Sequence, residues 1–488
     1  MAIQIHNTLS RRKEPFEPLN PPKVSIYNCG PTVYSYFHIG NARNFVVIDT
    51  VRRHLECRGY EVKLVQNLTD VDDKIIQRAS QEGLSPQELA EKYTAAYFEH
   101  AERLGIRRAD AHPKATENIG PMIAMIERIL QRGMAYVAGG NVYFRVPLFK
   151  GYGQLSGNKL EDLREGARVE VDERKEHPAD FDLWKAAKPG EPAWESPWGP
   201  GRPGWHIECS AMALLYLGET VDIHSGGADL VFPHHENERA QSQCANGRPL
   251  AKYWLHNGFL TIRNERGEEE KMSKSLGNDL RIDQILQRFD PMTVRAFLLS
   301  AHYRSPLVYS ESALSESAAA LDRLSDALDT ARKLLALAGG PQPASRRHPA
   351  ALEQAAEIRQ EFLAGMDDDF NTPRAMGALF RGVNEIHEIR QKERASGRLS
   401  PEALDALASL VETVEELAGV LGLAALRQGL GPAAQDSLVE PLIALLISVR
   451  DQARKAKAYD LADSVRGGLE NLGVALEDHP QGTIWKRK

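Results

Sequence analysis

VSIYNCGPTVYSYFHIGNARNFVVIDTVRRHLEC (residues 24–57), followed by EVKLVQNL (61–68), is the stretch that decides the fold. Its first six residues are mostly apolar and rich in strand formers, and a helical pattern begins near Ala42 after a Gly-Pro loop. Strand, helix and strand in close succession predict a right-handed βαβ unit within a parallel sheet. Ligands of such sheets bind beyond the carboxyl ends of the strands. Cys29 and the NLTD segment (67–70) fall at those ends.

The α/β pattern continues along the chain with one interruption. Residues 114–132 are expected to form a helix, and about 140–200 an irregular insert rich in Gly, Pro and Trp. The pattern resumes at TVDIHSGGADL (220–230), with a helix over about 234–244 and a strand near 256–262. We therefore expect a Rossmann-type parallel-sheet domain of the α/β class that carries an inserted connective segment.

Beyond about residue 310 the character of the sequence changes. Ala, Leu, Glu and Arg recur at helical spacing with almost no strand signal, which predicts an α-helical bundle. GGPQPASRRHP (339–349) is expected to be a loop within this bundle. A linker, RQGLGPAAQ (427–435), is expected to separate a small final unit.

The bulk properties indicate a cytosolic protein with a sizeable core. Hydrophobic residues make up 42% of the 488 residues and charged residues 26%, as in ordinary globular proteins. The N-terminus lacks the apolar stretch typical of a signal sequence, and no stretch approaches the roughly 20 apolar residues of a membrane span. The formal net charge of −7 argues against nonspecific coating of nucleic acid but is compatible with a local basic face.

A turn of the type that binds phosphate precedes the first long helix. His38 and Asn41 flank Gly40 there, and the N–H groups and dipole of a helix N-terminus suit phosphate. Gly40 would let a nucleotide approach the backbone closely. By itself the turn is equally typical of a helix cap.

A second motif, KMSKSLGN (271–278), lies far downstream. Lys271 and Lys274, with Ser273 between them, could clamp a polyphosphate, although alone they would also suit a solvated loop. In this order the two motifs resemble the HIGH and KMSKS signatures of class I aminoacyl-tRNA synthetases. Asn41 departs from the first signature, since many members have His there, and Asn can donate a hydrogen bond but cannot carry charge.

A metal site is indicated by PHHENERAQ (233–241), which places His234 and Glu238 on one face of a helix. An imidazole and a carboxylate at this spacing can bind Zn²⁺, although the pattern also suits a surface hydrogen bond. Cys29 and Cys209, each next to a glycine-containing segment, would complete a mixed site of two sulfurs, one nitrogen and one oxygen.

Five segments, in order, resemble the cysteinyl-tRNA synthetase family: YNCGPTVY, NLTDVDDKI, RPGWHIECSAM, GGADLVFPHHENE and KMSKSLGN. The similarity covers the catalytic half densely and continues to GVALEDHPQGTIWKRK at the C-terminus. The resemblance implies one zinc ion per chain, bound by Cys29, Cys209, His234 and Glu238. The residues that match no ligand position, and are expected to be structural, are Cys57, Cys244 and His235.

The resemblance also implies the substrate contacts. Those for ATP are His38, Gly40, Asn41, Gly226, Gly227, Lys271, Ser273 and Lys274, and those for cysteine are Cys29, Gly30, Thr69, Trp205, Asp229 and His234. Asp229 would bind the α-ammonium group, and Trp205 and Thr69 would form walls of the cysteine pocket. Core packing is the structural alternative for Trp205, and a helix cap for Asp229.

The reaction implied is the activation of L-cysteine by ATP and its transfer to tRNA(Cys). His38, Asn41, Lys271 and Lys274 would stabilise the phosphates, with Mg²⁺ on the pyrophosphate. Serine differs from cysteine by one atom, and apolar pockets separate such isosteres by only about 10- to 200-fold. Zinc prefers thiolate to hydroxyl, so the metal would select cysteine, and no editing domain is expected.

The family's domain order implies three parts. These are a class I catalytic domain over 1–305 with its connective insert at about 115–205, a DALR-type bundle over 306–426, and an anticodon-binding unit over 427–488. Arg454 and Asp463 would read anticodon bases, helped by the basic residues near 450–457 and by Trp485. Composition alone would favour a solvated amphipathic helix at 449–473.

Two alternatives are set against this interpretation. A mycothiol-pathway ligase, which joins cysteine to an amino sugar, resembles the same catalytic half, but residues 350–488 argue against it. A non-catalytic paralogue should have lost ligands or lysines that are present here.

Some family members are thought to form cysteine persulfide with pyridoxal phosphate, but Gln77 stands where a second lysine often accompanies Lys74. The family also favours a monomer.

Overall fold

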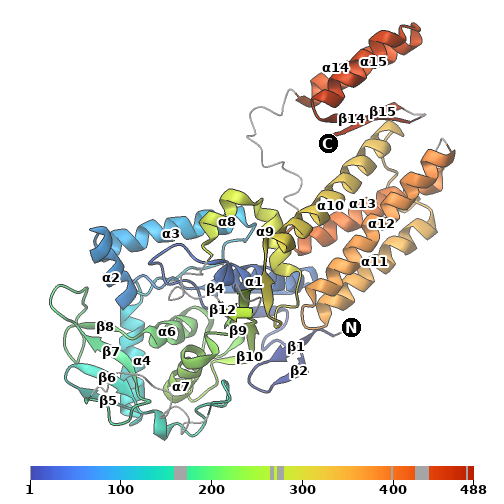
Figure 1. Cartoon of the computed structure of the whole chain (residues 1–488). Coiled ribbons are helices and arrows are strands. Elements are labelled where there is room, and N and C mark those ends of the chain that lie inside the picture. Colours follow the sequence, from blue (N-terminus) through green and yellow to red (C-terminus); the bar gives the residue numbers. More distant parts are fainter. Residues whose placement is uncertain are drawn as a thin grey trace. The chain divides into compact units, whose positions relative to one another are not determined.

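The computed structural model describes residues 2–158, 173–263, 269–271, 280–396, 399–423, 439–479 and 482–487. The chain divides into two compact units (Figure 1). Unit 1 consists of Met1–Leu314 and Asp367–Thr372, and unit 2 of Ser315–Met366 and Pro373–Lys488. Among the described residues, no helix is both long and apolar enough to cross a membrane.

Unit 1 is built on a four-stranded parallel sheet with the strand order β10-β9-β3-β4. The strands are β3 (Lys23–Asn28), β4 (Glu61–Gln66), β9 (Val221–Gly227) and β10 (Ala251–Asn257). Helix α1 (Ile39–Cys57) connects β3 to β4. The predicted α/β class and its parallel sheet are therefore confirmed.

Both faces of this sheet are covered. Tyr27, Val65 and Trp254 lie in one row across the strands and share a buried core with residues of α4 (Ile119–Gln131), α6 (Trp205–Leu217) and α7 (Glu236–Asn246). Side chains alternate along a strand, so Ile26 and Leu64 point to the opposite face. Helix α1 contacts β4, β9 and β10 on that side. Coverage of both faces is typical of parallel sheets.

The connective insert contains an antiparallel sheet, whose strands the expectation of an irregular segment over 140–200 missed. Its order is β5-β6-β7-β8, with strands at Ala135–Ala138, Asn141–Phe144, Phe181–Ala186 and Gly201–Pro203. The strands are short, long connections separate β6 from β7 and β7 from β8, and glycine and proline in the segment obscured the alternating pattern. Phe144 and Phe181 stack across two of these strands with ring centroids 5.0 Å apart.

Unit 1 contains further elements that the sequence reading placed only in part or missed. They are β1 (Gln4–Asn7), β2 (Arg12–Pro15), α2 (Asp73–Glu82), α3 (Pro86–Arg103), β11 (Leu260–Arg263), β12 (Glu269–Lys271), α8 (Ile282–Arg288), α9 (Pro291–Leu299) and β13 (Leu307–Tyr309). The single strand expected over 256–262 divides at Gly258. A β-carbon there would lie 2.6 Å from the carbonyl oxygen of Arg304, so only glycine fits.

Unit 2 is mostly helical, as predicted. Its helices are α10 (Glu311–Leu337, whose first turn belongs to unit 1), α11 (Pro349–Asp367), α12 (Thr372–Ser396), α13 (Pro401–Val420), α14 (Val439–Lys455) and α15 (Tyr459–Asn471). The expectation of almost no strand was wrong at the C-terminus, where β14 (Val474–His479) pairs with β15 (Gly482–Arg487). Val474 and Leu476 pack this hairpin on Ile443 of α14 and Leu469 of α15. The linker expected at 427–435 lies outside the described residues.

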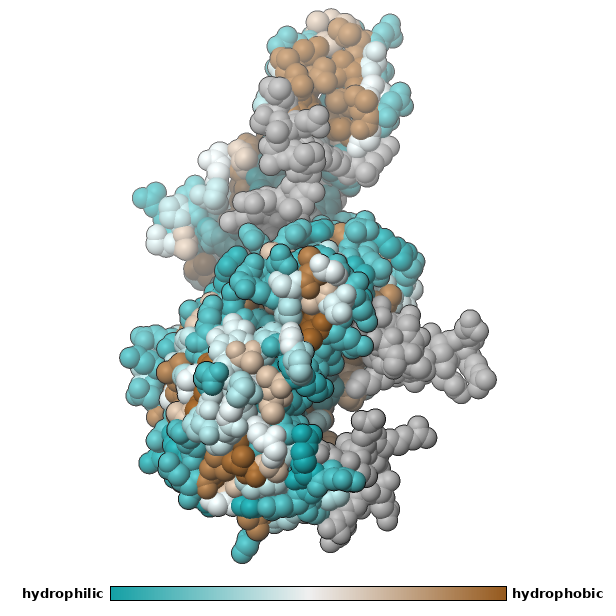
Figure 2. Space-filling model, turned by 90° about the vertical axis from the view of Figure 1, so that its left-hand side faces the viewer, coloured by the Kyte–Doolittle hydropathy of each residue, from teal (hydrophilic) through white to brown (hydrophobic). Residues whose placement is uncertain are grey.

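Helix α14 presents an apolar face to solvent. Leu442, Leu445, Leu446 and Val449 follow helical spacing and are 37–58% exposed. Figure 2 shows brown side chains gathered on this part of unit 2.

Candidate active site and metal centre

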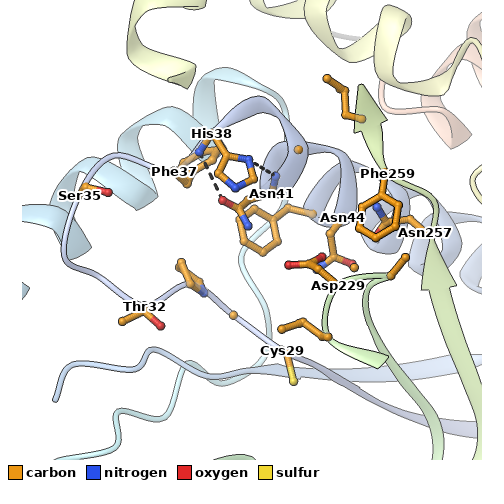
Figure 3. Close-up of a pocket in the computed structure, with 18 of the residues that line it drawn as sticks. Cys29, Thr32, Ser35, Phe37, His38, Asn41, Asn44, Asp229, Asn257 and Phe259 are labelled. Carbon is orange, nitrogen blue, oxygen red and sulfur yellow. Dashed lines mark hydrogen bonds between the residues drawn. The ribbon is translucent and has the colours of Figure 1, made fainter. Parts of the chain in front are cut away.

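A cavity of about 540 Å³ lies at the carboxyl ends of the parallel strands. Its walls come from the loop after β3, the first turn of α1, the turn after β9 and the residues after β10. Figure 3 shows His38, Asn41, Asp229 and Cys29 arranged around it. Gly30, Gly40, Gly227 and Trp205 also line it.

His38 and Asn41 cap helix α1 while they line the cavity. The His38 Nδ1 atom accepts a hydrogen bond from the Asn41 backbone N–H at 3.2 Å, and the Asn41 Oδ1 atom accepts from the His38 N–H at 3.3 Å. Asparagine, which occupies the position of the second signature histidine, therefore completes a capping box. His38 and Asn41 therefore cap the helix and line the cavity at the same time.

The segment that carries the second signature is joined to this cavity at its downstream end. The Ile39 N–H donates to the Leu280 carbonyl, and the Ile282 N–H donates to the Phe37 carbonyl, both at 3.0 Å. At the upstream end, Lys271 pairs with Thr261 in the backbone of β12 and β11. The Lys271 side chain, Ser273 and Lys274 lie outside the described residues.

Beneath the cavity lies a buried cluster of four residues: Cys29, Cys209, His234 and Glu238. The two Sγ atoms are 3.7 Å apart, and Cys209 Sγ is 3.5 Å from His234 Nε2. Glu238 Oε1 is 2.8 Å from His234 Nε2 and 3.5 Å from Cys29 Sγ. Ligands of a tetrahedral zinc ion lie roughly 3.3–3.8 Å from one another, given bonds of about 2.0–2.3 Å, so most of these distances suit zinc.

The acid and base groups of this cluster set one another's ionisation. Burial opposes ionisation of Glu238, but the charges of His224 and His234 outweigh it and hold the pKa of Glu238 well below its usual range. Burial likewise opposes ionisation of Cys209, but contacts with Cys29 and His234 lower its pKa to about 6. Burial raises the pKa of Cys29. Burial opposes protonation of His234, but Glu238 and Cys209 raise its pKa to about 10, so their negative charge is balanced by imidazolium, and a metal ion would take the place of that proton.

Four further histidines, none of them predicted as a ligand, surround the cluster, and one of them, His206, has its Nδ1 atom 2.9 Å from His234 Nδ1. His224 contacts Glu238 Oε2 through Nε2 at 2.6 Å and the Tyr27 carbonyl through Nδ1 at 2.9 Å. His235 Nε2 lies 3.2 Å from Cys29 Sγ, and its Nδ1 lies 2.7 Å from His256 Nε2. His235 was expected to be merely structural, yet with Cys29, His224 and Glu238 it forms a second possible ligand group.

A local irregularity in the chain explains why the sequence did not predict His235 beside this cluster. Consecutive residues of a regular helix point about 100° apart, so His234 and His235 would not share a site. Here the helix is irregular over Val231–His235, and Phe232 has φ −138° and ψ 134°. The doubled histidine in PHHENE was the only sequence signal for it. In contrast, among the residues that the structure describes, neither Cys57 nor Cys244 belongs to a group of side chains that could bind a metal ion.

Of the two residues predicted to form walls of the cysteine pocket, Trp205 lines the cavity and Thr69 does not. The Trp205 ring stacks on His234 with centroids 4.2 Å apart and remains 36% exposed at the cavity. Thr69 is buried, does not line the cavity, and donates to Glu208 Oε2 at 2.7 Å. Glu208 had not been assigned from the sequence.

The comparisons with known proteins identify the family. A family model described as "tRNA synthetases class I (C) catalytic domain" matches residues 15–319. The cysteine–tRNA ligase of Pelotomaculum thermopropionicum is 50% identical over 495 residues, with 100% of both chains covered. That of Symbiobacterium thermophilum is 50% identical over 490 residues, also with 100% of both chains covered.

The chain belongs to the cysteine–tRNA ligase family. A methionyl-tRNA synthetase of Mycobacterium tuberculosis, bound by methionyl-adenylate, has the same fold with a TM-score of 0.64 and 16% identity. The similarity covers 84% of this chain and 93% of that one. A DALR domain model matches residues 361–425, over α11, α12 and α13.

The C-terminal residues of this family member divide into buried and exposed groups. Arg450, one of the basic residues expected near RNA, is buried and donates to both oxygens of Asp478 at 2.7 and 2.6 Å. Arg454 is half-exposed and donates to Asp478 at 3.2 Å. Lys333 Nζ lies 4.0 Å from the Trp485 ring centroid. Asp463 is exposed.

Proposed function

We propose that the protein activates L-cysteine with ATP, forms cysteinyl-adenylate, and transfers cysteine to the 3′ end of tRNA(Cys). The observation that carries the proposal is the position of the buried Cys29, Cys209, His234 and Glu238 cluster at the base of a cavity whose rim is the capped N-terminus of α1. Full-length similarity to cysteine–tRNA ligases supports it.

The cluster fits a zinc ion. Two sulfurs, an imidazole nitrogen and a carboxylate oxygen are a donor set that zinc prefers, and they are buried and close together. Cys29, Cys209, His234 and Glu238 would hold the ion, which would supply a preference for the substrate's thiol over a hydroxyl. The second group, with His224 and His235, has one sulfur fewer, and both His224 nitrogens already contact Glu238 and Tyr27.

The remaining roles follow from the walls of the cavity. Asp229, which is exposed within it, would accept hydrogen bonds from the substrate's α-ammonium group. The N-terminus of α1 at His38 and Asn41 would face the phosphates of ATP and its Mg²⁺, and the Gly226–Gly227 turn would lie against adenosine. Lys271, Ser273 and Lys274 would stabilise the phosphates from the other side.

The zinc assignment is tested with a matched pair of cysteine variants. Cys209→Ser should lower bound zinc from one ion per chain to less than about 0.2, and should allow serine-dependent exchange of pyrophosphate into ATP. Cys244→Ser, in α7 but outside the cluster, should change neither. Zinc is measured by elemental analysis, and exchange with cysteine and with serine. Full zinc content and intact serine rejection in Cys209→Ser would contradict the assignment.

We propose that residues 427–488 bind the anticodon, with Arg454 and Asp463 as base contacts, and that the protein acts as a cytoplasmic monomer. The exposed parts of Arg454 and Asp463 support these contacts. Replacement of each by alanine should weaken aminoacylation more than cysteine-dependent pyrophosphate exchange.

A cysteine–amino-sugar ligase is not favoured, because the curated relatives match along their whole length.

A further inference from the structure

A lysine that the proposed mechanism does not use lines one side of the cavity. Lys74 lies in the first turn of α2, where Asp72 caps the helix by accepting from the Lys74 N–H at 2.9 Å. Its Nζ atom is 5.7 Å from the centroid of the Tyr34 ring. Lys74 and Tyr34 both line the cavity, together with Thr32 and Trp205.

The strand order places Lys74 opposite the proposed adenosine site. The sheet runs β10-β9-β3-β4, and α2 follows β4 at the edge. The Gly226–Gly227 turn ends β9, on the other side of β3. The loop after β3 is bound to the loop after β4, because the Val33 N–H donates to the Thr69 carbonyl at 3.1 Å. The β4 side of the cavity thus lies across β3 from the turn proposed for adenosine, while Tyr34 belongs to the same loop as His38, which is proposed for the phosphates.

Two aspartates stand beside Lys74, and each has a partner of its own. Asp73 is engaged by Arg202 and by Lys185, whose Nζ lies 2.8 Å from the carboxylate. Asp72 is committed to the cap of α2. Among the described residues that line the cavity, Lys74 alone has a lysine or arginine side chain.

A lysine beside an aromatic ring on an open cavity wall suits single-stranded nucleic acid. The ammonium group attracts a phosphodiester, and a base can stack on an aromatic side chain. The exposed Trp205 ring lies on the same cavity. Because the second step of the proposed reaction needs the tRNA 3′ end at the substrate carboxyl group, an entry beside the β4 edge would bring it in from the side of β3 opposite the proposed adenosine site.

We propose that Lys74 and Tyr34 form a subsite for the single-stranded 3′ end of the tRNA, with Lys74 on a terminal phosphodiester. The inference rests on the proposed function, since it assigns a subsite for that function's second substrate.

Binding of two RNA probes tests the subsite. Lys74→Met should weaken binding of a full-length tRNA(Cys) transcript about three- to ten-fold, and lower the slope of log K against log salt by about 0.7. Binding of a transcript that lacks the last two nucleotides should be the same for Lys74→Met and the parent protein. Lys92→Met is the matched control, because Lys92 Nζ lies 5.1 Å from the Tyr93 ring and does not line the cavity. Equal weakening of both transcripts would overturn the proposal.

The two reaction steps supply a second readout. Single-turnover transfer of cysteine to tRNA should fall at least five-fold more in Lys74→Met than cysteine-dependent pyrophosphate exchange does. Lys74→Arg, which keeps the charge, should restore transfer. Equal losses in the two steps, or no loss in either, would overturn the subsite while leaving the proposed function in place. Absence of exchange in the parent protein would overturn the proposed function, and this inference with it.

Discussion

At the scale of single residues, Glu238 links the side chains of the candidate metal site. Its two oxygens contact His234 at 2.8 Å and His224 at 2.6 Å, and all three side chains are buried. A buried carboxylate is costly unless it is paired and hydrogen-bonded, and here the two imidazoles meet that need. His224 thus orients a proposed ligand through the oxygen that faces away from the cluster.

Arg43 gives a prediction at this scale. It is fully buried in α1 and donates to the carbonyl oxygens of Gly258, Phe259 and His302 at 2.9, 3.1 and 3.1 Å. Arg43→Met removes all three donors, and each unsatisfied buried group costs about 1–3 kcal/mol, so the free energy of unfolding should fall by roughly 3 kcal/mol or more. Gly258 and Phe259 line the cavity, so the KM for ATP should rise as well.

The measurements for Arg43→Met are urea unfolding and pyrophosphate exchange. Arg12→Met, at an exposed arginine of β2, should change the free energy of unfolding by less than about 0.5 kcal/mol. A loss below about 1 kcal/mol in Arg43→Met would show that other groups satisfy the three carbonyls.

At the scale of elements, the ends of β3 and β4 position the site. Gly30 follows β3, and its N–H donates to Asn67 Oδ1 at 2.9 Å. A β-carbon on Gly30 would lie 1.7 Å from the Asn67 carbonyl oxygen, well inside contact distance. The two chain segments approach this closely only because residue 30 has no side chain.

Gly30→Ala should therefore force the two loops apart and displace Cys29. We expect bound zinc to fall below half an ion per chain and the Tm to drop by several degrees, since the clash involves backbone atoms that cannot rotate away. Gly120→Ala is the matched control, because nothing lies within 4 Å of a β-carbon there, in the first turn of α4. Elemental analysis and thermal unfolding measure both variants, and normal zinc content in Gly30→Ala would refute the expectation.

At the scale of the molecule, the segment Asp367–Thr372 stands out. It joins α11 to α12 of unit 2 in sequence, yet it belongs to unit 1. Asp369 is buried and accepts from the His6 N–H and the Tyr303 hydroxyl, both at 2.8 Å. A cut after residue 314 would leave these groups without their acceptor, so the two units are not separable at one point of the chain.

The stability of unit 1 should fall as the pH drops below about 6.5. Burial lowers the pKa of His54, and its contact with Asp367, 3.0 Å away, offsets this only in part, while Arg58 lowers the pKa further. The folded pKa thus lies below the unfolded value of 6.5, so the unfolded state binds more protons as the pH falls. Burial lowers the pKa of His6, His112 and His302 in the same direction.

Denaturant unfolding between pH 7.5 and 5.5 measures this effect. His54→Gln, which keeps a donor toward Asp367, should make the loss of stability with falling pH shallower than in the parent protein. His348→Gln, at an exposed histidine, is the control and should leave the slope unchanged. An identical pH slope in His54→Gln would rule out His54 as a contributor.

Local patterns determined the parts of this protein that depend on neighbours in sequence. The first strand, helix and strand followed from residues 24–68, the helices beyond residue 310 from their own side-chain period, and the family from five short motifs, because these patterns are properties of short segments. The sequence patterns did not predict the sheet of the insert or the C-terminal hairpin, because their short strands become stable only when they pair and pack.

Tertiary structure alone decided how the site is surrounded. Cys29 and Cys209 are 180 residues apart in sequence, and His224, His235 and His256 come from three further places in unit 1. Parallel pairing of β3 with β9 brings His224 beside Tyr27, and the irregular turn before α7 directs His235 toward Cys29. No periodicity of the sequence predicts these contacts, because each contact joins segments that are distant in sequence. The segments meet only when they pack together in the buried interior of unit 1.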